Sequence, residues 1–320
     1  MNDPTQALTV DAKHALRAQE RSARRFNLMM AAFALSLTAF DLIVARLAHV
    51  GTKDYFFGAF YSLALLAGAR WYCRWRGLAR LVDASELGIW AVVFTNVLSV
   101  VIQLAGRSPR PLVDGELAHL DVRMHFATAA AVAIAGRLPA LRIPLALAYA
   151  LTGPLILVAV LLPALLGCAH ASRRYVLGIV LAAILTAAAF SIWPAAGPWT
   201  SEGYPPAREQ AAVTAYLLQL KSTKPVELDM EDAGIVAFPS FHVLLAILTA
   251  AALSAIRWLR APAWALSVLV GISTITTGWH YLVDVIGGII LSVISLAAAR
   301  LLLPESDGAM PATLRDSGVD

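Results

Sequence analysis

Two short segments of the sequence place titratable side chains at spacings that suit acid–base and nucleophilic chemistry. His280 and Asp284 are four residues apart, so on a helix they share one face. A carboxylate there accepts a hydrogen bond from one imidazole nitrogen and leaves the other nitrogen as a base or nucleophile. His242 follows Pro239, a residue type favoured at helix starts, where free N–H groups attract anions such as phosphate. These residues predict histidine-based phosphoryl transfer, with His242 available to protonate a leaving oxygen.

The elements that carry these residues are expected to be membrane-spanning helices. The 320 residues are 59% hydrophobic and 14% charged, with a mean hydropathy of +0.70, whereas a soluble chain is about half apolar and about a quarter charged. The apolar runs are long enough to cross a bilayer core and continue almost to the C-terminus. We therefore expect an all-α fold, a polytopic membrane helical bundle of about eight spans. The predicted spans are Leu28–His49, Tyr55–Tyr72, Leu87–Leu104, Ile143–Leu166, Val176–Trp193, Pro239–Ile256, Ala261–Thr277 and Val283–Leu303.

Basic residues indicate the orientation of these spans. Arg24-Arg25, Arg173-Arg174 and the arginines of residues 70–80 fall on one side if the spans alternate, and that side is expected to be cytoplasmic. Both termini then lie inside, and the two long connections, Ala105–Arg142 and Pro194–Phe238, lie outside. The net charge of +4 arises from such clusters beside apolar runs, so it does not indicate nucleic-acid binding.

The same topology gathers the three titratable residues at one depth. All of them fall near the outer leaflet interface, so the chemistry is expected on the extracytoplasmic face of a plasma or inner membrane.

The chain divides into a cytoplasmic tail (residues 1–26), a membrane domain (residues 27–303) and a polar tail (residues 304–320). Both cysteines fall in loops expected to be cytoplasmic, which supports neither a disulfide framework nor a metal cluster.

The two segments resemble the second and third signature motifs of the type 2 phosphatidic acid phosphatase superfamily, and more narrowly its inositol-phosphorylceramide synthase-like branch. Pro239-Ser240-Phe241-His242 matches one motif, and Gly278-Trp279-His280 with Asp284 matches the other; the resemblance covers about residues 190–300. It implies that His280 attacks phosphorus and forms a phosphohistidine, that Asp284 orients and stabilises His280, and that His242 protonates the departing alkoxide. It also implies a lipid phosphate substrate, water or an alcohol as acceptor, and no metal or other cofactor.

The residues that would bind the phosphate are less regular. The broader superfamily has an Arg six residues before the nucleophilic His, where this chain has Thr274, and a Lys at the position of Gln103 in its first motif. The synthase-like branch is looser at these positions. Arg107 and Arg110 are the candidates for the positive charge that a phosphoryl-transfer transition state requires. Ser240, inside the motif that ends at His242, is the third candidate substrate-binding residue.

Other interpretations of the same residues remain open. Two histidines and one carboxylate also form a legitimate metal site, which would make the protein a metal-dependent membrane hydrolase. The absent Arg leaves room for a non-catalytic member of the family or a lipid carrier. Gly287-Gly288 favours close helix packing. Asp114 and Asp121, in the first outer connection, are expected to cap loops, although they could also bind the hydroxyls of an acceptor.

Overall fold

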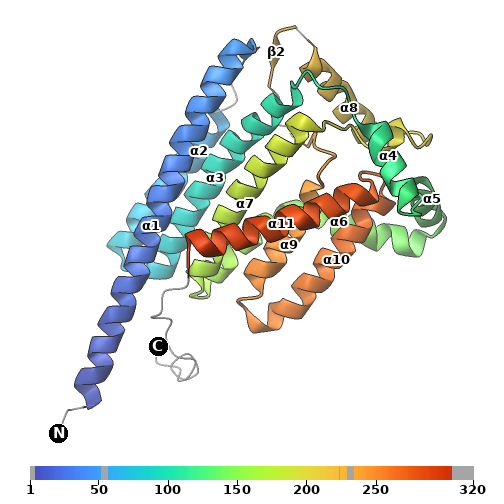
Figure 1. The fold of residues 1–320 in the computed structure, drawn as a ribbon. Helices are drawn as coiled ribbons and strands as arrows, with labels where there is room; N and C mark the ends of the chain where they lie inside the picture. The colour runs from blue at the N-terminus through green and yellow to red at the C-terminus, as the bar shows by residue number, and fades with distance from the viewer. Residues whose placement is uncertain (1–3, 52–56, 223, 229–233, 305–320) are drawn as a thin grey trace.

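The computed structural model describes residues 4–51, 57–222, 224–228 and 234–304, and the chain there is almost entirely helical (Figure 1). The expectation of an all-α fold is confirmed, with a two-residue parallel pair, β1 (Val50–Gly51) and β2 (Val226–Glu227), as the only strands in the described part. The predicted start of the second span, Tyr55, and most of the polar C-terminal tail lie outside the described residues. The helices are α1 (Pro4–Leu47), α2 (Phe57–Trp75), α3 (Ala79–Gly106), α4 (Asp114–Arg123), α5 (Thr128–Arg137), α6 (Pro139–Leu165), α7 (Ala169–Ile192), α8 (Arg208–Lys221), α9 (Phe241–Leu253), α10 (Arg260–Thr276) and α11 (Leu282–Leu302), with short 3-10 turns η1 (Pro198–Thr200) and η2 (Arg257–Leu259).

The predicted count of eight spans is not confirmed. Within the described residues, six helices are long and apolar enough to cross a membrane: Glu20–Leu47, Ala79–Gly106, Ala140–Leu165, Ala169–Ile192, Arg257–Thr276 and Leu282–Leu302. The predicted span Pro239–Ile256 is reduced to the 13 residues of α9, about 20 Å of helix against a hydrocarbon core of about 30 Å. The predicted span Tyr55–Tyr72 corresponds to α2, whose apolar character is diluted by Arg70 and Arg74.

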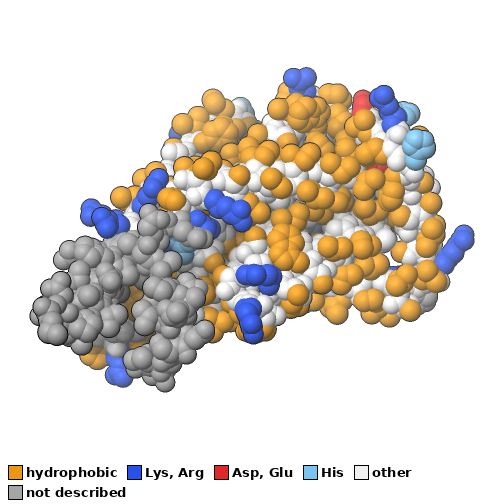
Figure 2. All heavy atoms as spheres, turned by 60° about the horizontal axis from the view of Figure 1, so that its bottom comes forward, with side chains coloured by type: hydrophobic (Ala, Val, Ile, Leu, Met, Phe, Trp, Pro, Cys, Tyr) orange, Lys and Arg blue, Asp and Glu red, His pale blue; other side chains and the backbone are white. Residues whose placement is uncertain are grey.

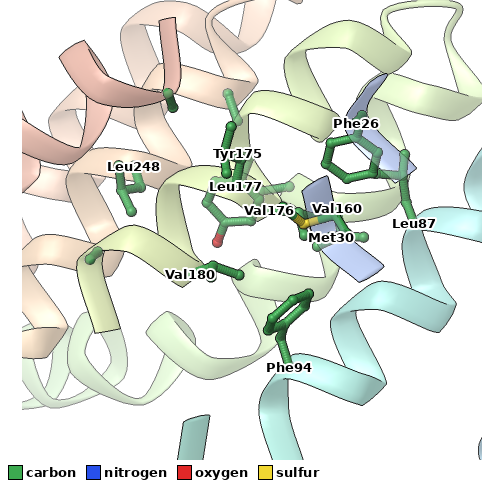
Figure 3. Close-up of a cluster of buried hydrophobic side chains, with 14 of the residues drawn as sticks. Phe26, Met30, Leu87, Phe94, Val160, Tyr175, Val176, Leu177, Val180 and Leu248 are labelled. Atoms are coloured by element: carbon green, nitrogen blue, oxygen red, sulfur yellow. The ribbon is translucent and has the colours of Figure 1, made fainter. Parts of the chain in front are cut away.

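The centre of the bundle is an apolar core around α7, which packs against α3, α6, α9 and α11. Figure 3 shows side chains from α1, α3, α6, α7 and α9 meeting there, among them Phe26, Phe94, Val160, Leu177 and Leu248. The outer surface is also apolar, as Figure 2 shows for one face, where orange side chains are interrupted by few charged ones. Large exposed residues such as those on α1, α6 and α11 account for this character, which is typical of helices that face lipid.

The two long connections, Ala105–Arg142 and Pro194–Phe238, contain helices of their own. α4 and α5 lie in the first connection and α8 in the second, and all three gather at one end of the bundle (Figure 1). α5 falls in the apolar stretch before α6, whereas α4 and α8 are polar in composition. The same end of the bundle carries the start of α9 and the start of α11, the two places where the candidate residues lie.

Close packing joins those two helix starts. A Cβ atom at Gly288 of α11 would lie 2.5 Å from the backbone oxygen of Ser240, and one at Gly287 would lie 3.0 Å from Cβ of Pro239. The interpretation of Gly287-Gly288 as a packing feature is therefore confirmed.

We expect Gly288→Ala to destabilise the protein by about 1–3 kcal/mol, because the methyl group meets backbone and the two helix starts must move apart. Gly271→Ala, on α10, is the matched control, since a Cβ there meets nothing within 4 Å. Thermal unfolding in detergent measures the difference. Equal unfolding temperatures for the two variants would contradict the close approach.

Candidate active site

His280 lies in a tight turn between α10 and α11. The backbone oxygen of Thr274 accepts hydrogen bonds from the N–H groups of Trp279 and His280, both at 3.1 Å. Gly278 adopts a φ of +78°, a left-handed conformation that favours glycine, and its carbonyl accepts a hydrogen bond from the Tyr204 hydroxyl. This turn ends α10 and sets His280 two residues before the start of α11.

The imidazole of His280 is held in one tautomer. Its Nδ1 lies 2.8 Å from the backbone oxygen of Ala237 and 3.3 Å from Oδ2 of Asp284. A carbonyl oxygen only accepts, so Nδ1 carries the hydrogen and Nε2 carries the lone pair. Burial lowers the pKa of His280 to about 4, although the hydrogen bond to Ala237 opposes this shift. At neutral pH the ring is therefore uncharged, with Nε2 in the nucleophilic form and free of hydrogen bonds to any described residue.

Asp284 orients His280 through the geometry of a helix start rather than through a shared helix face. Its Oδ2 accepts the N–H of Tyr281 at 2.9 Å as well as that of Nδ1. Asp284 is the third residue of α11, whereas His280 precedes the helix. The predicted contact is confirmed, but its cause is the capping of α11. The carboxylate is fully buried, and Oδ1 has no hydrogen-bond partner among the described residues.

His242 reaches the same place from the first turn of α9. Ser240 caps that helix, since its Oγ accepts the N–H of Val243 at 3.5 Å while its own N–H donates to the backbone oxygen of Asp284 at 3.0 Å. The ring centroids of His242 and His280 are 6.0 Å apart. His242, which is distant in the sequence, therefore meets the His280–Asp284 pair at the junction of α9 and α11.

A chain of aromatic side chains begins at His242. Tyr149 of α6 stacks on His242 with ring centroids 4.2 Å apart and an interplanar angle of 21°. Trp279 lies 6.1 Å from the Tyr149 ring, and Trp199 meets Trp279 edge-on at 5.6 Å. Tyr149 was not among the predicted site residues, because it belongs to no motif and lies in an apolar helix. The Tyr149 ring therefore covers one face of the His242 imidazole.

The comparison with protein families agrees with this geometry. A model of the PAP2 superfamily, the type 2 phosphatidic acid phosphatases, matches residues 115–298, more than half of the chain. The chain belongs to the PAP2 superfamily. The match runs from α4 into α11 and includes His242, His280 and Asp284. Comparisons with curated proteins and with solved structures found no match.

Superfamily membership makes this chain a relative of phosphatases and phosphotransferases and supports a membrane lipid phosphoesterase in general. The narrower resemblance to the inositol-phosphorylceramide synthase-like branch stays a prediction. Gln103, Arg107 and Arg110 precede the matched region, so the part of the chain that resembles the first signature motif is supported by sequence spacing alone.

Arg107 and Arg110 are not brought to the histidines by any contact in the described structure. The guanidinium of Arg107 donates to the backbone oxygen of Lys224 at 3.4 Å, and Arg110 is exposed. Neither forms a hydrogen bond or ion pair with the two histidines or the carboxylate among the described residues. Ser240, the third candidate, is buried and serves as the helix cap described above.

At the two positions where the broader superfamily has cations, this chain has Thr274 and Gln103, and both side chains are packed inside the protein. Thr274 is fully buried, and its hydroxyl donates to the backbone oxygen of Gly271 at 2.8 Å. Gln103 is also fully buried and accepts a hydrogen bond from the hydroxyl of Tyr216 on α8. In this PAP2 superfamily member both positions therefore hold helices and turns together.

The described residues contain no cluster of ligands that would support the metal-site interpretation. No group of three or more His, Cys, Asp and Glu side chains is arranged there to hold a metal ion. His280 already uses Nδ1 on Ala237 and Asp284. The contacts present suit a nucleophile and its orienting carboxylate better than a set of converging ligands.

Proposed function

We propose that the protein is a membrane phosphoesterase or phosphotransferase that acts on a lipid phosphate at the extracytoplasmic face through a phosphohistidine on His280. The observation that carries this proposal is the tautomer of His280. The hydrogen bond from Nδ1 to Ala237 and the contact with Asp284 leave the lone pair on Nε2, the nitrogen that must attack phosphorus. Superfamily membership supports the class of reaction.

In the first step Nε2 of His280 forms a bond to phosphorus, and the bond between phosphorus and the lipid oxygen breaks. Protonated His242 gives its proton to the departing oxygen, which leaves as an alcohol. The phosphorylated ring keeps its Nδ1–H and gains positive charge, which the Asp284 carboxylate stabilises at 3.3 Å. This step requires a protonated His242, although burial and the nearby His280 lower the pKa of its imidazole to about 3.

In the second step water or an alcohol attacks phosphorus and the P–N bond breaks. His242, now neutral, takes the proton of the attacking hydroxyl, and His280 recovers its lone pair. Water yields inorganic phosphate, whereas an alcohol yields a new phosphoester. An assay of purified protein on a panel of phospholipids, with and without inositol-type acceptors, distinguishes the two activities through phosphate release and head-group transfer. No product from any substrate would contradict the proposal.

The extracytoplasmic location of the site is part of the proposal, and cysteine labelling tests it. In a protein whose Cys73 and Cys168 are replaced by Ser, a cysteine at the exposed position of Glu209 on α8 should react with an impermeant maleimide from outside intact cells. A cysteine at exposed Arg76 should react only after the membrane is opened. The opposite pattern would move the site to the cytoplasmic face.

A non-catalytic lipid-binding role is the alternative that one observation favours, namely the cation-poor surroundings of the histidines. Thr274 and Gln103 offer no positive charge, and Arg107 bonds elsewhere. Such a protein would transport or bind lipid without consuming it, and replacing His280 would leave the lipid composition of membranes unchanged. A metal-dependent hydrolase would instead lose activity on addition of a chelator, to which the histidine mechanism is indifferent.

A further inference from the structure

The short helix α4 packs directly behind the candidate nucleophile. Asp114, Leu117 and Asp121 are spaced three and four residues apart, so they share one face of α4, and all three are buried. Leu117 belongs to an apolar cluster that includes Ala237 and Tyr281. Ala237 supplies the carbonyl that fixes the His280 tautomer, and Tyr281 follows His280 in the chain.

Asp121 caps the helix that carries Asp284. Its Oδ2 accepts the N–H of Leu282 at 2.9 Å and the hydroxyl of Thr128 at 2.7 Å, and its Oδ1 accepts the N–H of Val283 at 3.0 Å. Leu282 and Val283 are the first two residues of α11, whose N–H groups have no partner within the helix. A carboxylate here also complements the positive end of the helix dipole.

Two carboxylates therefore accept the backbone N–H groups at the start of α11. Asp284 accepts the N–H of Tyr281, and Asp121 accepts the next two N–H groups from a different helix. His280 precedes these donors directly and follows a turn fixed by Gly278. A shift of the first turn of α11 would move Asp284 relative to Nδ1 of His280, so the length of that contact depends on the cap.

Asp114 holds the other side of the same region. Its carboxylate accepts the N–H groups of Ala196 at 3.0 Å and Gly197 at 2.8 Å, and the Tyr281 hydroxyl lies 3.4 Å away. Burial raises the pKa of Asp114, and the two backbone N–H groups oppose that shift. Asp114 therefore anchors the connection after α7, as expected of a loop cap, while Asp121 alone among the residues of α4 bonds to the backbone of α11 in the described structure.

We propose that Asp121 is a positioning residue for the reaction: it fixes the first turn of α11 and thereby the geometry of the His280–Asp284 pair. This inference rests on the proposed function. It assigns a role in catalysis to a residue outside both motifs, which the sequence suggested only as a loop cap. Asp121 does not reach Nε2 of His280 and takes no part in the proton transfers.

Asp121→Asn tests this role with little change of shape. The amide nitrogen of Asn accepts no hydrogen bond, so one N–H group of α11 or the Thr128 hydroxyl loses its partner. We expect kcat per folded molecule to fall by about 10²-fold, the effect of a displacement of about 1 Å at a reacting pair, with KM little changed. Glu116→Gln, on the exposed face of α4, should keep wild-type kcat.

A second pair of variants keeps the test decisive if Asp121→Asn does not fold. Leu282→Pro removes only the N–H that Oδ2 of Asp121 accepts, and proline is tolerated at the first position of a helix. Tyr281 has φ −70° and ψ 161°, the extended conformation that precedes proline without a clash. Leu282→Ala trims the same side chain and keeps the N–H, so the ratio of the two kcat values isolates the hydrogen bond.

The outcomes separate this proposal from the proposed function. Turnover by the wild type together with a loss in Asp121→Asn, or in Leu282→Pro relative to Leu282→Ala, supports the positioning role. Active wild type with unchanged kcat in these variants overturns that role alone. A wild type without turnover on any lipid phosphate overturns both.

Discussion

His280→Asn is expected to lose turnover on a lipid phosphate by about 10⁴-fold or more, the scale seen when an enzymatic nucleophile is removed. Asn fills part of the same space and can still donate a hydrogen bond to the backbone oxygen of Ala237, so the turn between α10 and α11 should persist. It has no ring nitrogen to attack phosphorus. Initial rates of phosphate release, measured on purified protein in detergent or vesicles, give the ratio.

The matched control is His119→Asn, which makes the same substitution at an exposed histidine on α4. It should retain wild-type turnover. Thermal unfolding of both variants checks that the folded fraction is the same. Comparable turnover in His280→Asn and the wild type would show that phosphorus is attacked by another group, and the histidine mechanism would be wrong.

His242→Gln is expected to lose about 10³-fold in turnover on an alkyl phosphate such as a lipid, within the range for a general acid. The loss should be much smaller for phosphoenzyme formation from an aryl phosphate, because a weakly basic phenolate leaves without a proton. Gln retains polarity and volume, but it transfers no proton. The dependence of the loss on the leaving group is the measurement that identifies His242 as the acid.

The second step gives an independent readout of the same variant. Without His242 to take a proton from water, the phosphoenzyme should persist after an aryl substrate has released its phenol, and a burst of one phenol per site should appear. His125→Asn serves as a control, because His125 is exposed with a φ of 57°, a conformation that Asn tolerates. Equal losses in the rate of phosphoenzyme formation from alkyl and aryl substrates would mean that His242 acts on structure rather than on the leaving group.

Much of the site could be predicted from the sequence because the two motifs are local. His242 lies three residues after Pro239, and Asp284 lies four after His280, so each motif fixes its own geometry through a helix start. The apolar runs on either side predict one depth for both motifs. The helix-face argument for the His280–Asp284 pair gave the right contact for the wrong reason, since a carboxylate that caps its own helix also reaches back to the residue before it.

Contacts between distant segments could not be predicted in the same way. Tyr149 and Asp121 carry no motif, and each is defined by what packs against it: His242 for one, the first turn of α11 for the other. The length of α9 also depends on context. An apolar run of the Pro239–Ile256 kind predicts a span by hydropathy, but the helix starts only after the Ser240 cap and ends at Leu253. Hydropathy does not contain that information.

The residues predicted to bind the phosphate were the weakest part of the sequence prediction. Gln103 and Thr274 are buried and hydrogen-bond within the fold, Gln103 to the Tyr216 hydroxyl and Thr274 to the Gly271 carbonyl. Arg107 and Arg110 were predicted from their spacing in the sequence alone, and that spacing does not show where a side chain points. They remain candidates for the phosphate charge without a contact that supports them.

Trapping of the covalent intermediate tests the central claim most directly. Wild-type protein is mixed with a radiolabelled lipid phosphate, quenched in alkali after a few milliseconds to seconds, and digested for mass spectrometry. The account predicts an acid-labile, alkali-stable phosphoryl group on the peptide that contains His280. The group should be absent in His280→Asn and, when an aryl phosphate is the substrate, present at a higher level in His242→Gln. Turnover by the wild type with no phosphoryl group on His280 at any time, or with the group on another residue, would contradict it.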